Sequence, residues 1–370
     1  MKTLHKLWLR ALMAVLAIGF ASAAMAQDSD DKPAITIKTS AYATNGESNV
    51  ATILIGGTIE GTYIDVDCGY GLEEHELKIA QLDGEGSWSG TFITCNVSKD
   101  DVIRIYADDP SIIDVLNASG CYIRSIEMPE CTNLRILDLS HNELESLDLT
   151  NYNQLRALYL NDNPFNKSPL VIGSKPNLMI LDIGQIEKMT DSFTLTDYPN
   201  LVTFDAWANK SLNALDPTQC PLLQKISIDG TNVASLDLSN NERLTILNIS
   251  DTRIDEIDLS NTPYLNQLYC DHLSGSVNKG VKLKSLDLSH SPNLIYLFAS
   301  GNDFTSIDLS NNIYLQDIYL NDNKLTTIDL EKNVNLNNVI LRNNYFNFAT
   351  LPLPSESWNQ YDYMQRNMPI

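Results

Sequence analysis

The sequence is poor in basic residues, in histidine and in the motifs that carry catalysis. It has 25 lysines and arginines against 47 aspartates and glutamates, a formal net charge of −22, and five histidines in 370 residues. An acidic surface repels phosphate backbones and anionic lipid, so we expect neither nucleic acid nor a membrane surface as the partner. The chain also lacks an HExxH zinc motif, a GxSxG elbow and a phosphate-binding P-loop. We therefore predict a protein that is not an enzyme, with no catalytic residue and no cofactor.

Apolar runs long enough to cross a bilayer are missing as well. Residues 1–26 have Lys2, Lys6 and Arg10, an apolar stretch over 11–21, and small residues before Gln27. This layout is typical of a secretory signal peptide, and the apolar stretch is too short for a transmembrane helix. No cysteine stands near the expected cleavage site, so no lipid anchor is expected. We predict export by this signal peptide to secretion, the cell surface or the periplasm, without membrane insertion.

Cysteine is scarce, and none of the six cysteines has the CxxC spacing of zinc or redox sites. Export permits disulfides. Cys68 and Cys95 fall within one small predicted domain, and we expect them to form a disulfide. Two buried free thiols are the alternative. Cys270 stands at a leucine position of the repeat described next, which predicts a core residue.

The chain does have an internal repeat. Its units open at Leu134, Leu155, Leu178, Leu201, Leu223, Leu244, Leu265, Leu294, Leu315 and Leu336, at intervals of 21 to 29 residues. Ile113 opens a degenerate unit 21 residues before Leu134. That gives about eleven coils, of which the first is imperfect. Self-similarity at this period predicts a solenoid, because a single coil cannot bury its leucines while stacked coils share one core.

Each unit contains two alternating stretches, such as Leu137-Asp138-Leu139 and Leu147-Asp148-Leu149. Alternation places the leucines on one side and predicts two short strands per coil. A unit of 21 residues leaves little room for a helix between them. We expect a mainly β and irregular solenoid, a curved superhelix with a parallel sheet on its concave side and a second, shorter parallel ladder elsewhere.

The shared pattern L-x-x-L-x-L-x-x-N-x-L-x-x-L-D-L-S resembles the leucine-rich-repeat family, in the short subclass with units of about 21 residues seen in bacterial proteins. The resemblance extends over residues 113–350. It implies a solenoid that is internalin-like in broad class. It also implies a protein partner more often than a glycan, although a fold by itself does not fix a function.

An asparagine follows the first strand in most units. The position holds Asn142, Asn163, Asn209, Asn302, Asn323 and Asn344, whereas Cys121, Ile186, Thr231 and Thr252 replace it in other units. An amide side chain has donors and an acceptor, so stacked asparagines can bond buried peptide groups where the chain leaves the sheet. We predict a structural asparagine ladder.

The segments around the repeats predict the domain organisation. Residues 27–32 are acidic and are predicted to be a disordered start. Residues 33–107 have short alternating runs separated by turns, which predict a small antiparallel β domain, of β-sandwich type, that caps the solenoid of 108–350. Residues 351–370 form either a tail or a cap. The long unit after Leu265 predicts a loop around 273–280, which is either a functional loop or a tolerated insertion.

An aspartate recurs in the second stretch of the units. Asp148, Asp237, Asp258, Asp287, Asp308 and Asp329 share one position, and Asp216 is offset from it by one residue in our count. The row is interpreted as a solvated face. The alternative is weak calcium binding along Asp237, Asp258, Asp287, Asp308 and Asp329, because carboxylates at strand spacing repel one another unless they are screened.

Residues that alternate with the inward leucines of the first strand are expected to face outward. The predicted ligand-binding residues are Tyr159, Trp207, Tyr269, Asp271, Tyr296, Phe298, Asp317, Tyr319 and Asn321; Asp182, Asp205 and Arg342 share this face. Aromatic rings with carboxylates and amides suit a protein surface or a sugar. Alternatively, the rings only stabilise neighbouring strands.

These observations predict a non-enzymatic, exported binding or adhesion protein that recognises an extracellular or cell-surface protein on the concave face. One alternative is a glycan-binding surface or periplasmic protein. Another is a structural spacer that presents a further domain. The oligomeric state is left open.

Overall fold

The computed structural model describes residues 32–41, 50–59, 61–79, 90–167, 170–186, 192–272 and 281–365. Contacts divide the chain into Met1–Pro33 and Ala34–Ile370, and the second unit is described below. The predicted signal peptide, residues 27–31 and the insertion at 273–280 lie outside the described residues. Among the described residues, no helix has the length and apolar character needed to cross a membrane.

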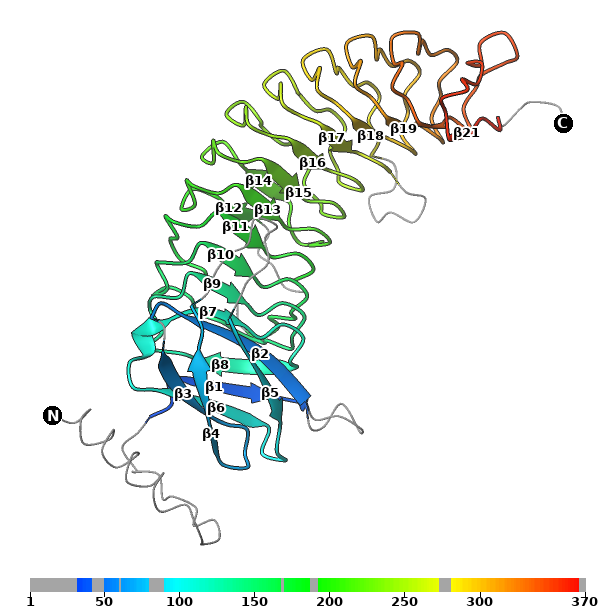
Figure 1. Cartoon of the computed structure of the whole chain (residues 1–370). Coiled ribbons are helices and arrows are strands. Elements are labelled where there is room, and N and C mark those ends of the chain that lie inside the picture. Colours follow the sequence, from blue (N-terminus) through cyan, green and yellow to red (C-terminus); the bar gives the residue numbers. More distant parts are fainter. Residues whose placement is uncertain are drawn as a thin grey trace, which may run out of the picture. The chain divides into compact units, whose positions relative to one another are not determined.

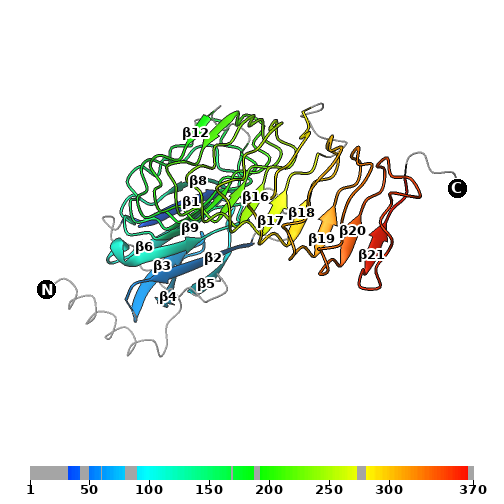
Figure 2. The ribbon, with the colours of Figure 1, turned by 90° about the horizontal axis from the view of Figure 1, so that it is seen from above.

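Short parallel strands lie side by side along one side of the stacked coils, and loops occupy the rest of each coil (Figures 1 and 2). In sheet order they are β9 (Ile136–Asp138), β10 (Ala157–Tyr159), β11 (Ile180–Asp182), β13 (Thr203–Asp205), β15 (Lys225–Ser227), β16 (Ile246–Asn248), β17 (Gln267–Tyr269), β18 (Tyr296–Phe298), β19 (Asp317–Tyr319), β20 (Asn338–Ile340) and β21 (Gln360–Asp362). Each strand pairs with the next without a shift in register. The predicted solenoid is confirmed.

The core is the shared leucine ribbon that the repeat predicts. The middle residue of each strand points inward, and Leu137, Leu247 and Leu297 have no exposed surface. Cys270, at a leucine position, is also buried. A fully buried leucine contributes about 1.5–3 kcal/mol, so stacking the coils supplies the stability that one coil lacks.

The region before the repeats is built from antiparallel strands, as expected. They are β1 (Ile35–Thr39), β2 (Val50–Gly57), β3 (Thr62–Asp67), β4 (Leu72–Leu77), β5 (Thr91–Asn96) and β6 (Val102–Ala107), followed by the 3₁₀ turn η1 (Pro110–Ile112). The first coil adds β7 (Ile113–Asn117) and β8 (Ile123–Glu127). Cys68, after β3, and Cys95, in β5, form a disulfide with Cα atoms 5.5 Å apart.

The first coil joins this region to the solenoid through both of its strands. β7 pairs in parallel with β9 and antiparallel with β2, so the solenoid sheet runs on through β2 to β5 and has 14 strands. β8 instead pairs antiparallel with β1, at the edge of the five-stranded sheet β4-β3-β6-β1-β8. The end of the solenoid core is therefore closed by backbone pairing as well as by side-chain contact.

The second ladder is shorter than the alternating stretches suggest. Among the described residues, β12 (Ser192–Thr194) and β14 (Ala214–Asp216) pair in parallel, and Asp148 forms an isolated bridge with Val171. The aspartate of this stretch accepts a hydrogen bond from the backbone amide two residues further on, both where the ladder forms, as Asp216 does from Thr218, and where it does not, as Asp237 does from Ser239 at 2.9 Å.

Asparagine side chains bind the backbone where the chain leaves the sheet. Asn323 Nδ2 donates to the carbonyls of Ala299 in the preceding coil and Leu320 in its own, at 2.9 and 3.1 Å. Its Oδ1 accepts the amide of Phe304 at 3.2 Å. Asn142, Asn163, Asn209, Asn302 and Asn344 make the same kinds of bond, and all six are buried.

A second column of buried polar side chains was not predicted. It lies three residues after the last leucine of the L-D-L-S stretch. Asn241, Asn312 and Asn333 each donate to two carbonyls there, Tyr152 donates to the carbonyl of Met128, and buried Lys175 donates to that of Ile172 at 2.5 Å. The residue type varies along this column, so the sequence does not reveal it, but each side chain bonds backbone carbonyls at the second turn of its coil.

We predict that Asn323→Ala destabilises the protein by about 3 kcal/mol, because two buried carbonyls and one buried amide lose their partner. The matched control is Asn335→Ala, which removes one exposed bond to the carbonyl of Ile313 and should cost less than about 1 kcal/mol. Urea denaturation followed by circular dichroism measures both. Equal midpoints for the two variants would contradict the structural role of the ladder.

Candidate binding surface

The site residues lie on the outward side of the 14-stranded sheet. In the solenoid strands of this sheet from β9 to β20 the middle residue is buried, and the first and third residues point away from the core. The residue two positions after the strand continues this alternation. We call the side chains at these three positions the sheet face. It includes all nine of the predicted ligand-binding residues.

Three aromatic rings form a continuous stack on this face. Tyr269, Phe298 and Tyr319 are the third residues of β17, β18 and β19 and are in register. The ring centroids of Tyr269 and Phe298 are 4.9 Å apart, and those of Phe298 and Tyr319 are 4.5 Å apart, with planes within 15° of parallel. We call these three rings the aromatic ladder.

The stacking determines which part of each ring is free. Phe298 has a ring against both of its faces, so its edge is the part left for contact. The Tyr269 hydroxyl donates to Gln267 Oε1 at 3.0 Å and fixes the first ring. All three side chains are half-buried. The ladder is thus a preorganised apolar ridge with hydroxyls at its two ends.

Polar residues beside the ladder are linked from coil to coil. Asp271 Oδ1 accepts the amide of Ser300 at 2.7 Å, and the Ser300 hydroxyl donates to Asn321 Oδ1 at 2.9 Å. Burial raises the pKa of Asp271 above its ordinary value. On the other side of the ladder, Tyr296 lies in register between Gln267 and Asp317. Seven of the nine predicted ligand-binding residues therefore lie together, on the neighbouring coils of β17, β18 and β19: Tyr269, Asp271, Tyr296, Phe298, Asp317, Tyr319 and Asn321.

Trp207 and Tyr159 lie apart from this patch, several strands away. The Trp207 indole covers Gly184 of the preceding coil, where a Cβ atom would collide with the ring. Tyr159 packs against a separate cluster made of Leu54, Val115, Ile136 and Ala157, all buried on the outward side of the sheet. Because this cluster covers the outward side of the sheet as far as β10, the open part of the sheet face begins near β11.

Aspartates dominate the middle of the sheet face. Asp182 and Asp205 are neighbours in register on β11 and β13. Asp205 forms an ion pair with Lys225 at 2.8 Å. Burial raises the pKa of Asp182 to about 6, and the neighbouring Asp205 carboxylate adds to the effect. A charged Asp182 is therefore costly to the folded protein.

The aspartate row of the L-D-L-S stretch has a local role. Asp237, Asp258, Asp287 and Asp308 accept the amide of the serine two residues on, each at 2.9 Å, and Asp329 does the same with Glu331. These bonds lower the pKa of the first four carboxyls. Asp216 makes the equivalent turn with Thr218, so it is in register with the row rather than offset. Within the described residues, no group of three His, Cys, Asp or Glu is arranged to hold a metal.

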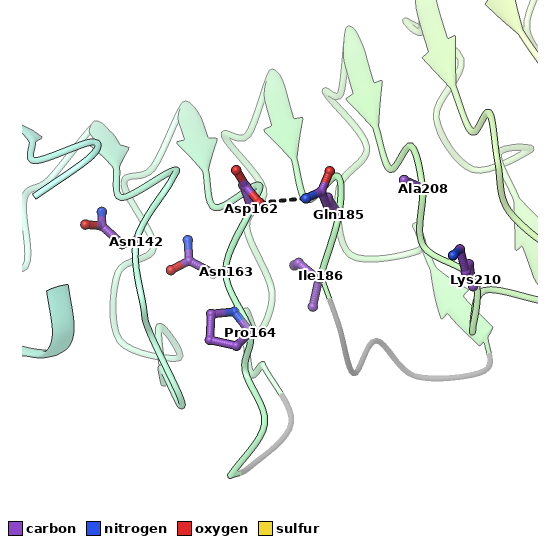
Figure 3. A pocket seen from close by; sticks show the side chains of 8 residues that line it. All are labelled: Asn142, Asp162, Asn163, Pro164, Gln185, Ile186, Ala208 and Lys210. Atoms are coloured by element: carbon purple, nitrogen blue, oxygen red, sulfur yellow. Dashed lines mark hydrogen bonds between the residues drawn. The ribbon is translucent and has the colours of Figure 1, made fainter. Parts of the chain in front are cut away.

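A hollow of about 450 Å³ lies where several coils leave the sheet (Figure 3). It is lined by Asn142, Asp162, Asn163, Pro164, Gln185, Ile186, Ala208 and Lys210. Asp162 bonds to Gln185 Nε2 and to His141 Nδ1, both at 2.8 Å, so its carboxylate is already occupied. None of the eight lining residues is a serine, cysteine or histidine that could act as a nucleophile or base.

The comparisons with known proteins agree with this architecture. The leucine-rich-repeat family model matches residues 133–153. A leucine-rich-repeat protein of Leptospira interrogans is 20% identical, with a TM-score of 0.50, over 63% of this chain and 67% of that one. The Arabidopsis receptor kinase HAESA, solved with a peptide hormone and a co-receptor, is 19% identical, with a TM-score of 0.51, over 65% of this chain and 44% of that one.

An internalin from Listeria monocytogenes is 20% identical, with a TM-score of 0.44, over 70% of this chain and 88% of that one. No curated protein matches the sequence. The chain thus spans less than half of the plant receptor and two thirds or more of the two bacterial proteins. Similarity at these identities shows the fold.

We predict that Asp182→Asn stabilises the protein at pH 7.5 by about 1 kcal/mol, because it removes a carboxylate that burial disfavours. The folded protein holds the Asp182 proton more tightly than the unfolded chain does. The wild type therefore gains stability as the pH falls from 7 towards 5, and the advantage of the variant shrinks. Urea midpoints at pH 7.5 and 5 measure both effects.

The control is Asp258→Asn, for which the opposite sign is expected at pH 7.5. Hydrogen bonds from Ser260 lower the pKa of Asp258, so its charged form stabilises the folded state. If Asp182→Asn lowers the midpoint at pH 7.5 as Asp258→Asn does, the interpretation of Asp182 as a strained carboxylate is wrong.

Proposed function

Because this chain has the leucine-rich-repeat fold, we propose that it is a non-enzymatic binding protein whose sheet face recognises a protein partner. The observation that carries the proposal is the aromatic ladder. An ordered aromatic ridge that remains half-exposed on a soluble surface is characteristic of a contact site. We further propose that the protein is exported and acts in adhesion or recognition outside the cell, as the leader-like sequence at 1–26 suggests.

The geometry of the ladder favours a protein over a glycan. Aromatic side chains that bind sugars offer a ring face to the apolar side of the sugar ring. Here both faces of Phe298 are covered by its neighbours, and each tyrosine has one face covered. Ring edges and hydroxyls fit the side chains and backbone groups of a protein partner. The peptide hormone in the HAESA complex is a precedent for such a partner on this fold.

The surroundings of the ladder support a contact role as well. Asp271 and Asn321 are held by Ser300, so their remaining lone pairs and amide protons have fixed directions. Side chains that are ordered before binding lose little conformational entropy when a partner arrives. A rim of directed polar groups around an apolar centre is the usual organisation of a protein interface.

We predict that the double variant Phe298→Ala/Tyr319→Ala binds its partner at least about 30-fold more weakly than the wild type, as expected when interface hot spots of about 2 kcal/mol are lost. The mature chain, immobilised, would capture partners from surface extracts of bacterial and eukaryotic cells. Surface plasmon resonance with each purified partner then gives the affinities. Circular dichroism melts verify that the variant is folded.

The matched control is Tyr264→Ala/Tyr314→Ala, which removes two rings of the same kind from turns outside the sheet face, where they are 60% and 53% exposed. This control should bind like the wild type. A captured protein that binds the ladder variant and the wild type equally would refute the proposal. Binding to a glycan array that is lost in the ladder variant would favour the glycan alternative instead.

A further inference from the structure

The sheet face carries more negative than positive charge over the part that is open. Between β11 and β20 its acidic side chains are Asp182, Asp205, Asp229, Asp271 and Asp317, and its basic side chains are Lys225 and Arg342. Both basic side chains are already engaged in ion pairs. Lys225 pairs with Asp205 at 2.8 Å, and Arg342 pairs with Asp362 of β21 at 3.6 Å.

The other four carboxylates accept hydrogen bonds from neutral groups. Asp182 accepts the amide of Gly184 at 3.0 Å, and Asp271 that of Ser300 at 2.7 Å. Asp229 accepts bonds from the Ser227 hydroxyl and the Asn248 amide, both at 2.9 Å, and Asp317 from Asn338 Nδ2 at 2.8 Å. In the described part of the chain, none of these four forms an ion pair with lysine or arginine.

These carboxylates are also partly removed from water. Asp182 and Asp271 are half-buried, and burial raises the pKa of both. A hydrogen bond from a neutral donor orients a carboxylate without cancelling its charge. A charged group that is held in place, partly desolvated and without a counterion gains more from an incoming cation than a fully solvated one does.

The four carboxylates are evenly spaced along the stack. They belong to the coils of β11, β15, β17 and β19, which are two strands apart at each step of the sheet order. Each step along the stack is therefore about 10 Å, and the four coils span about 29 Å in that direction. The carboxylates do not form a straight row, because Asp182 is a third strand residue and Asp229 and Asp271 lie two residues after their strands. Asp317 is a first strand residue, on the other side of the aromatic ladder from Asp271. An extended chain covers about 3.3 Å per residue, so about nine residues span the four coils, and its side chains alternate in direction and can reach both sides of the ladder.

We propose that the partner segment held by the sheet face is an extended basic peptide segment that runs along the stack, with lysine or arginine about every third residue. This deepens the proposed function and rests on it. The guanidinium or ammonium groups neutralise Asp182, Asp229, Asp271 and Asp317. The intervening apolar side chains lie against the aromatic ladder, which lies between Asp271 and Asp317 at the β17 to β19 end of the stack.

The probe is a fluorescein-labelled peptide made of four Arg-Ser-Leu repeats, and the readout is fluorescence anisotropy with the full mature chain. We expect the double variant Asp182→Asn/Asp271→Asn to weaken binding by at least about tenfold. Asparagine keeps the acceptor oxygen in both positions, so the fold is retained. A peptide of four Glu-Ser-Leu repeats should not bind.

The matched control is Asp258→Asn/Asp308→Asn, which makes the same change in net charge in the L-D-L-S row. This control should change the affinity by less than about twofold at physiological salt, because charges beyond the Debye length are screened. Equal weakening by the two pairs would overturn the proposal, since total charge alone would then explain binding. Failure of the Arg-Ser-Leu peptide to bind the wild type at millimolar concentration would also overturn it.

Two outcomes separate this inference from the proposed function. If a captured protein partner depends on Phe298 and Tyr319 but binds Asp182→Asn/Asp271→Asn as tightly as the wild type, the basic segment is wrong and the protein-binding function stands. If the Arg-Ser-Leu peptide binds through the carboxylates while no captured protein depends on the ladder, the proposed use of the ladder is wrong and the basic segment stands.

Discussion

Where each strand of the solenoid ends, the backbone turns inside the protein, and its peptide groups have no further strand to pair with. Unpaired buried carbonyls cost more than most single contacts contribute. The amide of Asn323 solves this for two coils at once, because it bonds a carbonyl in its own coil and one in the coil before. The leucine ribbon supplies the larger share of the free energy, but these side chains allow the chain to turn within it.

The turn also constrains the backbone of the residue just before each asparagine of the structural asparagine ladder. His141, Asp162, Asp322 and Asn343 all have a positive φ at this position, between 55° and 60°. Gly301 has φ 75°, and a Cβ there would collide with the carbonyl oxygen of His272. Aspartate and asparagine adopt this conformation more readily than most residues. The aspartate or asparagine in the middle of the N-D-N and R-N-N triplets therefore suits the backbone geometry, although Ala208 also adopts it, with φ 57°.

Most of the fold could be predicted from the sequence, because the leucine spacing reports directly on which side chains share the core. Leu137 and Leu297 are buried for the reason that the alternation gives. The second polar column could not be predicted, because Tyr152, Lys175 and Asn312 do one task with different chemistry. The pairing of β8 could not be predicted either. Its sequence has the pattern of a repeat, but it pairs with β1, which lies outside the repeats.

The residues that belong to the sheet face could be predicted from the sequence, but the way they pack there could be predicted only in part. Alternation identifies Tyr269, Phe298 and Tyr319 as outward residues, and equal register from coil to coil then stacks them. Alternation cannot reveal that Leu54 and Ile136 are buried on the same outward side, because that depends on packing beyond the repeat. It also cannot show which carboxylates form an ion pair with a lysine or arginine. Lys225 reaches Asp205 on the neighbouring strand, and Asp182 does not obtain a partner of its own.

Charge and aromatic area on this face act on each other. A stacked ring excludes water from the side chains beside it, and a carboxylate near such a ridge is less screened than one in bulk solvent. Asp271, two residues after Tyr269, is such a carboxylate in position, and burial raises its pKa above the ordinary value. The coils also hold each ring and each carboxylate at a fixed position along the stack, since every strand pairs with the next in constant register. On the proposed function, a rigid apolar ridge bordered by partly desolvated negative charge selects a partner by both shape and sign, and neither element would do so alone.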